Sequence, residues 1–218
     1  MRRYAQELIG TFFLVATVGF TGIAAGPGVI APLAIGSILM VMVYAGGHIS
    51  GAHYNPAVTL GVFMRGRCAP GDVLPYIAAQ VFGAIVAASL VLFVKAGAAV
   101  DPFVAPHPAA ALVAEFCFTF ALVYVVLNVA TAKATSGNSY FGLAIGFTVL
   151  VGAFAVGGVS GAAFNPAVAV GATTMGLLSP STLWIYLTAE FLGGAAAAAV
   201  FRALNPDEMA GRLLKSAA

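Results

Sequence analysis

The sequence predicts an all-α membrane protein with six transmembrane helices and two re-entrant half-helices, arranged as an inverted repeat. Three observations carry this prediction: an apolar composition, six apolar stretches long enough to cross a bilayer, and sequence blocks of the first half that recur in the second. The 218 residues are 61% hydrophobic and 7% charged, with a mean hydropathy of +1.03. Soluble domains carry about 25% charged residues, so the lipid bilayer is the expected surrounding.

The apolar stretches define the predicted helices, because a helix needs about 20 apolar residues to span the hydrocarbon core. They are residues 5–25, 30–48, 73–95, 109–131, 139–158 and 181–202. The start, Met1-Arg2-Arg3, is compatible with a signal peptide, but Glu7 interrupts the region that should be apolar. We therefore expect the first stretch to be a retained transmembrane helix.

Basic residues predict the orientation, because Lys and Arg are retained on the cytoplasmic side. With the N-terminus inside, the inner side holds Arg2, Arg3, Arg65, Arg67, Lys133, Arg202, Arg212 and Lys215. The outer side holds Lys95. Both termini are predicted to be cytoplasmic, in a plasma or inner membrane, and the net charge of +2 reflects topology rather than a nucleic-acid partner. The positions of Cys68 and Cys117 suggest neither a disulfide nor a metal, and no cofactor is expected.

Three blocks of the first half recur in the second half in the same order. Glu7 in YAQELIGTFFLV matches Glu115 in LVAEFCFTFALV. SGAHYNPAVTLG (50–61) matches SGAAFNPAVAVG (160–171), and AAQVFGAIVAA (78–88) matches TAEFLGGAAAA (188–198), at nearly the same offset. Each half holds three predicted spans, so the second half must enter the membrane inverted. We expect a first repeat at 1–108, an inverted repeat at 109–202 and a cytoplasmic tail at 203–218, with the working site between the halves.

One tripeptide occurs in both halves, as Asn55, Pro56 and Ala57 and again as Asn165, Pro166 and Ala167. Asn is a favoured N-cap and Pro a favoured first helical residue. The segment from Pro56 to Met64 is long enough for about 14 Å of helix, which is half a bilayer. The pattern predicts two half-helices that meet tip to tip at the midplane. Their positive ends disfavour cations there, and the Asn amides are expected to face a passing solute.

Acidic residues inside predicted spans usually mark function. Glu7, Glu115 and Glu190 could couple a carrier to protons, or could accept hydrogen bonds that hold the re-entrant loops. Gln80 takes the position equivalent to Glu190 and cannot cycle a proton, which favours the scaffolding role. His48 is expected to line the inner mouth or to brace the first loop.

Taken together, GGHISGAHYNPAVTLGVF (46–63), SGAAFNPA and AEFLGG make the chain resemble the aquaporin (major intrinsic protein) family over nearly its full length. The resemblance implies a pore through each monomer, a homotetramer, and passive passage of water and small neutral solutes. An enzyme is not expected, because no nucleophile–base set or metal cluster falls at a lumenal position of the sequence.

Most members of that family carry an Arg directly after the second tripeptide, where this chain has Val168. By spacing, the other filter positions fall at Ile35, Ala162 and Ala153, the last with Gly152 as an alternative. Pore diameter, lining donors and charge decide selectivity. A wide, apolar filter is therefore expected, which admits glycerol, urea, hydrogen peroxide, ammonia or neutral metalloid acids. A water-dominant pore, a closed pore and a small secondary transporter are the alternatives.

Overall fold

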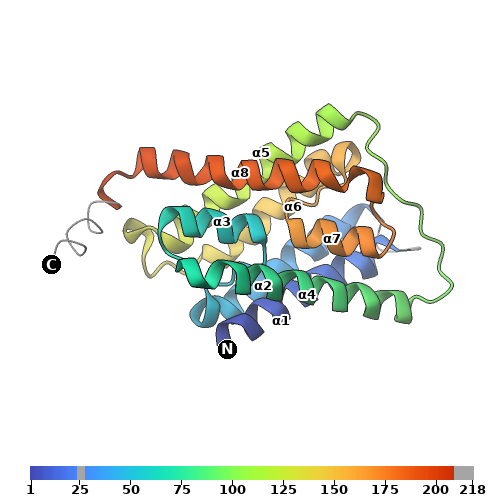
Figure 1. Cartoon of the computed structure of the whole chain (residues 1–218), viewed down its shortest axis with the longest axis horizontal. Helices are drawn as coiled ribbons and strands as arrows, with labels where there is room; N and C mark the ends of the chain where they lie inside the picture. Colours follow the sequence, from blue (N-terminus) through green and yellow to red (C-terminus); the bar gives the residue numbers. More distant parts are fainter. Residues whose placement is uncertain (24–27, 209–218) are drawn as a thin grey trace.

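The structure is a computed structural model that describes residues 1–23 and 28–208. Its helices are α1 (Arg2–Gly22), α2 (Ala31–Ser50), α3 (Pro56–Arg65), α4 (Pro70–Val94), α5 (Pro108–Thr131), α6 (Phe141–Ser160), α7 (Pro166–Thr174) and α8 (Leu183–Leu204). Three single turns of 3-10 helix lie at Gly28–Ile30, Lys133–Thr135 and Pro180–Thr182. Figure 1 shows the two short helices, α3 and α7, at the front of the bundle between α8 and α4.

The six predicted spans are confirmed, because six of these helices are long and apolar enough to cross a membrane. Their bounds differ from the prediction by a few residues. The largest consequence is at α2, which continues to Ser50 and ends where Gly51 adopts a left-handed conformation. Residues 24 and 25 of the first predicted span lie outside the described residues. So do Arg212, Lys215 and the rest of the predicted tail beyond residue 208.

Both tripeptides begin half-helices, as expected from N-cap chemistry. The Asn55 side-chain oxygen accepts hydrogen bonds from the backbone N–H groups of Ala57 (2.8 Å) and Val58 (3.3 Å). Asn165 accepts from Ala167 (3.0 Å) and Val168 (3.5 Å) in the same way. Pro follows each Asn at a position where the missing N–H has no intrahelical acceptor to lose.

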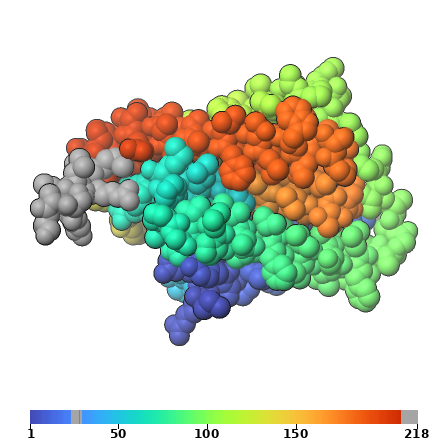
Figure 2. All heavy atoms as spheres, in the orientation of Figure 1, coloured from blue at the N-terminus to red at the C-terminus, as the bar shows by residue number. Residues whose placement is uncertain are grey.

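The inverted repeat is visible in the packing. In the first half α1 lies along α4, and in the second half α5 lies along α8. Each half-helix packs most extensively on a long helix of the opposite half, α3 on α8 and α7 on α4. Figure 2 shows α3 and α7 at the surface between α8 and α4. The two halves are therefore interlocked rather than laid side by side.

Glycines permit the closest helix crossings. A Cβ atom at Gly83 of α4 would lie 2.6 Å from the Leu8 carbonyl oxygen of α1. At the equivalent crossing, a Cβ atom at Gly193 of α8 would lie 2.6 Å from the Phe116 carbonyl oxygen of α5. Lipid tails are as apolar as the side chains, so the hydrophobic effect does not drive helices together within a bilayer. Close van der Waals contact at these glycines therefore supplies much of the packing energy.

Candidate functional site

The tips of α3 and α7 meet inside the bundle. The side-chain amide of Asn55 donates to the Phe164 carbonyl oxygen, and that of Asn165 donates to the Tyr54 carbonyl oxygen, both at 2.9 Å. Each Asn is almost fully buried, at 3% and 4% exposure. An amide nitrogen has two N–H groups, so one of them ties the opposite loop and one remains. The sequence reasoning anticipated the cap and the tip-to-tip geometry, but not this exchange between the loops.

The loop before each half-helix has strained backbone at matching positions. Ala52 and Tyr54 in the first loop have φ of 52° and 49°, and Ala162 and Phe164 in the second have φ of 57° and 51°. A left-handed conformation costs a non-glycine residue about 1–2 kcal/mol. Such a backbone persists only where the surroundings hold it.

In the first half, the buried carboxylate of Glu7 accepts four hydrogen bonds. One oxygen accepts from the Ser50 hydroxyl (2.7 Å) and the His53 backbone N–H (2.9 Å). The other accepts from the Tyr54 backbone N–H (2.6 Å) and the Gln80 amide (2.8 Å). These bonds fix the strained loop to α1 and α4.

In the second half, Glu115 accepts from the Ser160 hydroxyl (2.6 Å) and from the backbone N–H groups of Ala163 (3.1 Å) and Phe164 (2.8 Å). Glu190 is fully buried beside it. The Glu190 carboxyl group lies near Glu115 and the Asn165 backbone, but neither oxygen meets hydrogen-bond geometry with a described residue. An acid and an amide thus lie behind the first loop, and two acids lie behind the second.

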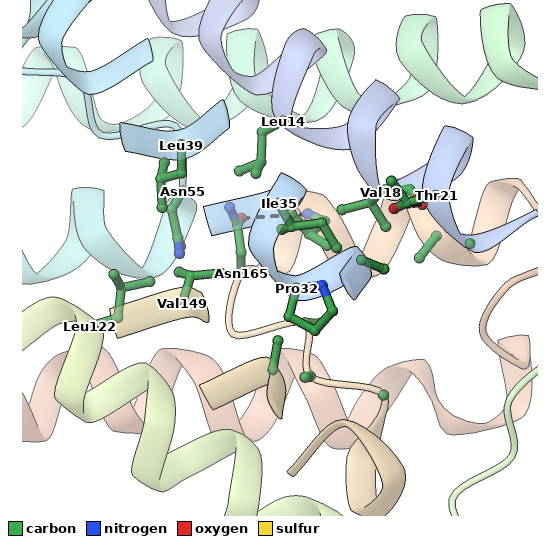
Figure 3. A pocket seen from close by; sticks show the side chains of 18 of the residues that line it. Leu14, Val18, Thr21, Pro32, Ile35, Leu39, Asn55, Leu122, Val149 and Asn165 are labelled. Atoms are coloured by element: carbon green, nitrogen blue, oxygen red, sulfur yellow. Dashed lines mark hydrogen bonds between the residues drawn. The ribbon is translucent and has the colours of Figure 1, made fainter. Parts of the chain in front are cut away.

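A cavity of about 270 Å³ runs past the two tips, and we call it the central cavity. Asn55, Asn165 and Ile35 line it (Figure 3). The other three positions inferred from spacing, Ala153, Ala162 and Val168, line it as well. Gly152 faces elsewhere, since a Cβ atom there would lie 2.7 Å from both Phe118 and Phe164. No Lys, Arg, Asp or Glu is among the described residues that line this cavity.

Helix α1 also lines the central cavity, which the sequence reasoning missed. Leu14 and Val18 face it, as do Leu122 and Val126 of α5. Leu14 corresponds to Leu122, and Val18 to Val126, at the same sequence offset that relates Glu7 to Glu115. The repeat therefore held the signal that could have found them.

A second cavity of about 690 Å³ lies towards the end of the bundle where the α5–α6 connection turns, and we call it the polar cavity. Its wall includes Arg67, Lys133, Ser136 and Asn138. His53 lines both cavities. His48, expected at this mouth or against the first loop, is not among the described residues that line the polar cavity. It lies inside α2, which extends past it to Ser50, and its side chain is exposed.

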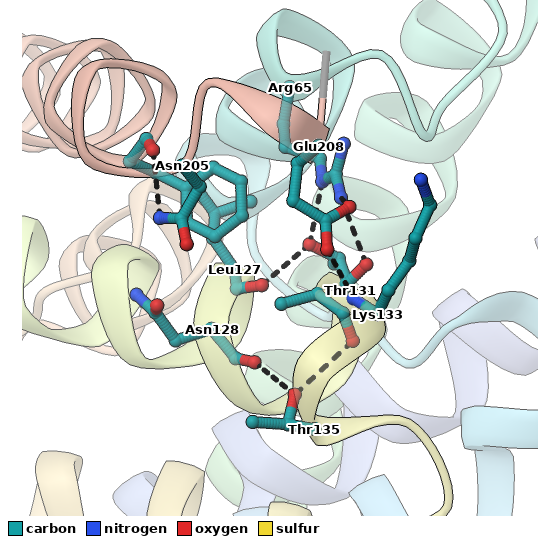
Figure 4. A network of polar contacts seen from close by, with 10 residues as sticks. Arg65, Leu127, Asn128, Thr131, Lys133, Thr135, Asn205 and Glu208 are labelled. Atoms are coloured by element: carbon teal, nitrogen blue, oxygen red, sulfur yellow. Dashed lines mark hydrogen bonds and ion pairs between the residues drawn. The ribbon is translucent and has the colours of Figure 1, made fainter. Parts of the chain in front are cut away.

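A buried ionic network is shown in Figure 4. It includes Thr131 and Lys133, which line the polar cavity. The guanidinium group of Arg65, at the end of α3, donates to the Thr131 carbonyl oxygen (3.0 Å) and to the Glu208 carboxylate (2.6 Å). Glu208 also accepts from the Lys133 backbone N–H. Burial raises the pKa of Glu208, but the bonds from Lys133 and Arg65 and their charges outweigh it, so this pKa is lowered overall. The network joins α3, the α5–α6 connection and the segment after α8.

Comparison with known proteins places this arrangement in context. Residues 1–201 match the sequence profile of the family described as Major intrinsic protein. The chain is 40% identical over 203 residues to aquaporin NIP1-4 of Oryza sativa subsp. japonica, covering 88% of the chain and 72% of that relative. It is 34% identical over 229 residues to aquaporin Z of Bradyrhizobium diazoefficiens, covering 95% of each. The aquaglyceroporin structure from Plasmodium falciparum shares the fold, with a TM-score of 0.78 at 23% identity over 92% of this chain and 94% of that one.

Proposed function

Since the chain belongs to the major intrinsic protein family of passive membrane channels, we propose that its central cavity conducts small uncharged solutes broader than water, together with water. The protein is a multi-pass integral membrane channel and not an enzyme. Glycerol is the solute we take as the defining test. Urea, hydrogen peroxide, ammonia and neutral metalloid acids belong to the same proposed class.

The observation that carries this proposal is the wall formed by the four filter positions. Val168 follows the second tripeptide, and Val168, Ile35, Ala153 and Ala162 all line the cavity. None of these side chains has a charge or a hydrogen-bonding group. Selectivity in such pores depends on diameter, on lining donors and acceptors, and on electrostatic barriers such as an Arg or a half-helix dipole. Here the side-chain cation is missing, while the two half-helix ends remain as the barrier to cations.

The carbonyl oxygens of the second loop favour solutes with O–H or N–H donors. Gly161, Ala162 and Ala163 line the cavity and have no side chain beyond Cβ. The N–H groups of Ala162 and Ala163 donate to Ser160 and Glu115, so the polar groups that this loop leaves for a solute are carbonyl oxygens. Without such partners, moving a polar solute from water into an apolar passage would cost about 1–3 kcal/mol of free energy for each polar group left without a hydrogen bond.

Purified protein in lipid vesicles tests the proposal by stopped-flow light scattering. We expect glycerol to enter about tenfold faster than into protein-free vesicles, a barrier lower by ~1.4 kcal/mol. The flux should rise linearly with the gradient and depend weakly on temperature. Water flow without glycerol flow would overturn the proposal in favour of a water-dominant pore. Saturable uptake that follows an ion gradient would instead favour a secondary transporter.

We assign the roles of the remaining residues on the same basis. Glu7, Gln80, Glu115 and Glu190 would act as loop scaffolds, and the exposed His48 would have no part in conduction. The polar cavity would face the cytoplasm with both termini, in a plasma or inner membrane. Support comes from Arg65, Lys133 and Glu208, which share one end of the bundle, while Lys95 bonds the Phe20 carbonyl at the other. Accessibility of single introduced cysteines in intact cells tests this orientation.

A homotetramer is the assembly expected from family membership. Native mass measurement of the detergent-solubilised protein tests it directly. The division of the chain into repeats at 1–108 and 109–202 stays a prediction. It can be checked by expressing the two segments as separate chains and asking whether they assemble.

A further inference from the structure

One aromatic ring from a loop reaches the central cavity. Among the described residues that line this cavity, Phe103 alone carries a benzene ring. It belongs to the connection between α4 and α5 rather than to a membrane helix. Its neighbours Pro102 and Val104 are exposed, whereas Phe103 is half-buried and packs against the core. Of the described residues of this connection, Phe103 alone lines the central cavity.

The backbone of Phe103 is held by the segment that follows α7. The Phe103 N–H donates to the Leu177 carbonyl oxygen (2.9 Å), and the Ser179 N–H donates to the Phe103 carbonyl oxygen (3.3 Å). Leu177 and Leu178 themselves line the cavity. Because main-chain groups make these two bonds, the position of residue 103 does not depend on its side chain.

The ring lies at the level of the filter. A Cβ atom built on Gly161 would lie 3.3 Å from Cδ1 of Phe103. Gly161 directly precedes the filter position Ala162 in the second loop. The ring thus packs against the loop that forms one side of the filter.

We propose that Phe103 is a specificity-determining residue that supplies the rigid, bulky wall which the four filter positions lack. This inference rests on the proposed function, because it takes the central cavity as the solute path. A ring held on a fixed backbone limits the width of the passage, while its apolar face offers no hydrogen bond to hold a solute. Water is narrower than this limit, so its permeability is little affected by the ring. Longer polyols, which are also bulkier, are excluded by it.

The test compares wild-type protein with Phe103→Ala in vesicles, using water, glycerol and the longer polyol xylitol as probes. We expect Phe103→Ala to raise xylitol permeability about tenfold while water permeability changes less than about twofold. Phe103→Trp should lower glycerol permeability. Phe93→Ala is the matched control, because Phe93 is 80% exposed on α4 and is not among the residues that line either cavity. Phe93→Ala should change neither the xylitol-to-water nor the glycerol-to-water permeability ratio.

The outcomes separate the two proposals. If wild-type protein passes glycerol and Phe103→Ala leaves the xylitol-to-water ratio unchanged, the role of Phe103 is refuted and the proposed function stands. If wild-type protein passes water only, the proposed function fails, and Phe103 is supported only if Phe103→Ala gains glycerol flux. Phe103→Leu keeps an apolar side chain, so it repeats the measurement should the Ala variant fold poorly.

Discussion

The two re-entrant loops have nearly the same backbone but different chemistry around it. In the first loop, Glu7 pairs with the amide of Gln80, which also donates to the Thr59 hydroxyl at 3.0 Å. In the second loop, Ala169 stands in the place of Thr59. The same strained geometry is thus maintained by two unequal sets of bonds.

The difference extends to the cavity walls and to the ends of the half-helices. His53 of the first loop lines both cavities, and its counterpart in the second loop is Ala163. Arg65 anchors the end of α3 through an ionic network, whereas its counterpart at the end of α7 is the buried Met175. At these equivalent positions, a polar side chain in the first half is matched by an apolar one in the second. This asymmetry within a symmetric backbone is what the proposed solute selectivity depends on.

Replacing the acids that hold the loops, Glu7 and Glu115, should give the largest loss of stability. Glu7→Ala leaves two backbone N–H groups, a hydroxyl and an amide without their acceptor, at about 1–3 kcal/mol for each buried group. We expect it to destabilise the fold by about 3–5 kcal/mol, and Glu115→Ala by about 1 kcal/mol less, since no amide bonds that carboxylate. Unfolding in detergent, followed by circular dichroism, measures both. A larger loss for Glu115→Ala would contradict the comparison of the loops.

The anchor of α3 should show the next largest effect. Glu208→Gln removes the charge that faces the buried Arg65, and we expect a loss of about 2 kcal/mol. Because the folded-state pKa of Glu208 is lowered from its ordinary value of 4.5, its stabilisation is complete above that value. It is lost as the pH falls through the folded-state pKa.

The control for this pH effect is Glu208→Gln itself, whose stability should vary less over the same acidic range. Equal acid sensitivity in the two proteins would show that the Arg65 network does not carry the effect. Arg65→Met makes the end of α3 resemble that of α7. It should lose stability at neutral pH as well, because the Glu208 charge is then left unpaired.

Gln80 and Glu190 are equivalent residues, and replacing each by the other's type should change the stability by a smaller amount. The sign of the change should be opposite in the two halves. Glu190→Gln provides an amide that can donate to Glu115 as Gln80 does to Glu7, so we expect a gain of about 1 kcal/mol. Gln80→Glu should destabilise by at least that amount. Thermal unfolding of both variants checks this, and a loss of stability in Glu190→Gln would mean that the Glu190 carboxyl group itself stabilises the second loop better than an amide does.

The smallest effect is expected when the first loop is made to resemble the second at the cavity wall. His53→Ala removes a ring that contacts the Thr59 hydroxyl through Nδ1 at 3.1 Å. We expect water and glycerol permeability to change less than about threefold, or ~0.7 kcal/mol in barrier. Loss of conduction would show that His53, rather than the second loop, dominates the path.

The fold and the meeting of the α3 and α7 tips could be predicted, because backbone N–H and C=O groups without hydrogen bonds are not tolerated in lipid. Span length, the repeat offset and the Asn-Pro pair each constrain backbone hydrogen bonding directly. Phe103 could not be predicted, since its position depends on main-chain bonds to Leu177 and Ser179, which lie far along the chain in the second half. The environment of His48 could not be predicted either. The end of α2 is decided by Gly51, and Gly46 and Gly47 nearby are equally plausible ends in the sequence.

The central claim is that the uncharged wall formed by the four filter positions lets solutes broader than water pass. The glycerol-to-water permeability ratio of Val168→Arg tests this claim most directly. Val168→Met serves as the control, because it adds length without charge. The account predicts that the Arg variant loses glycerol flux by about tenfold or more and keeps water flux, with the Met variant between it and the wild type. An Arg variant that folds and keeps the wild-type ratio would contradict the account.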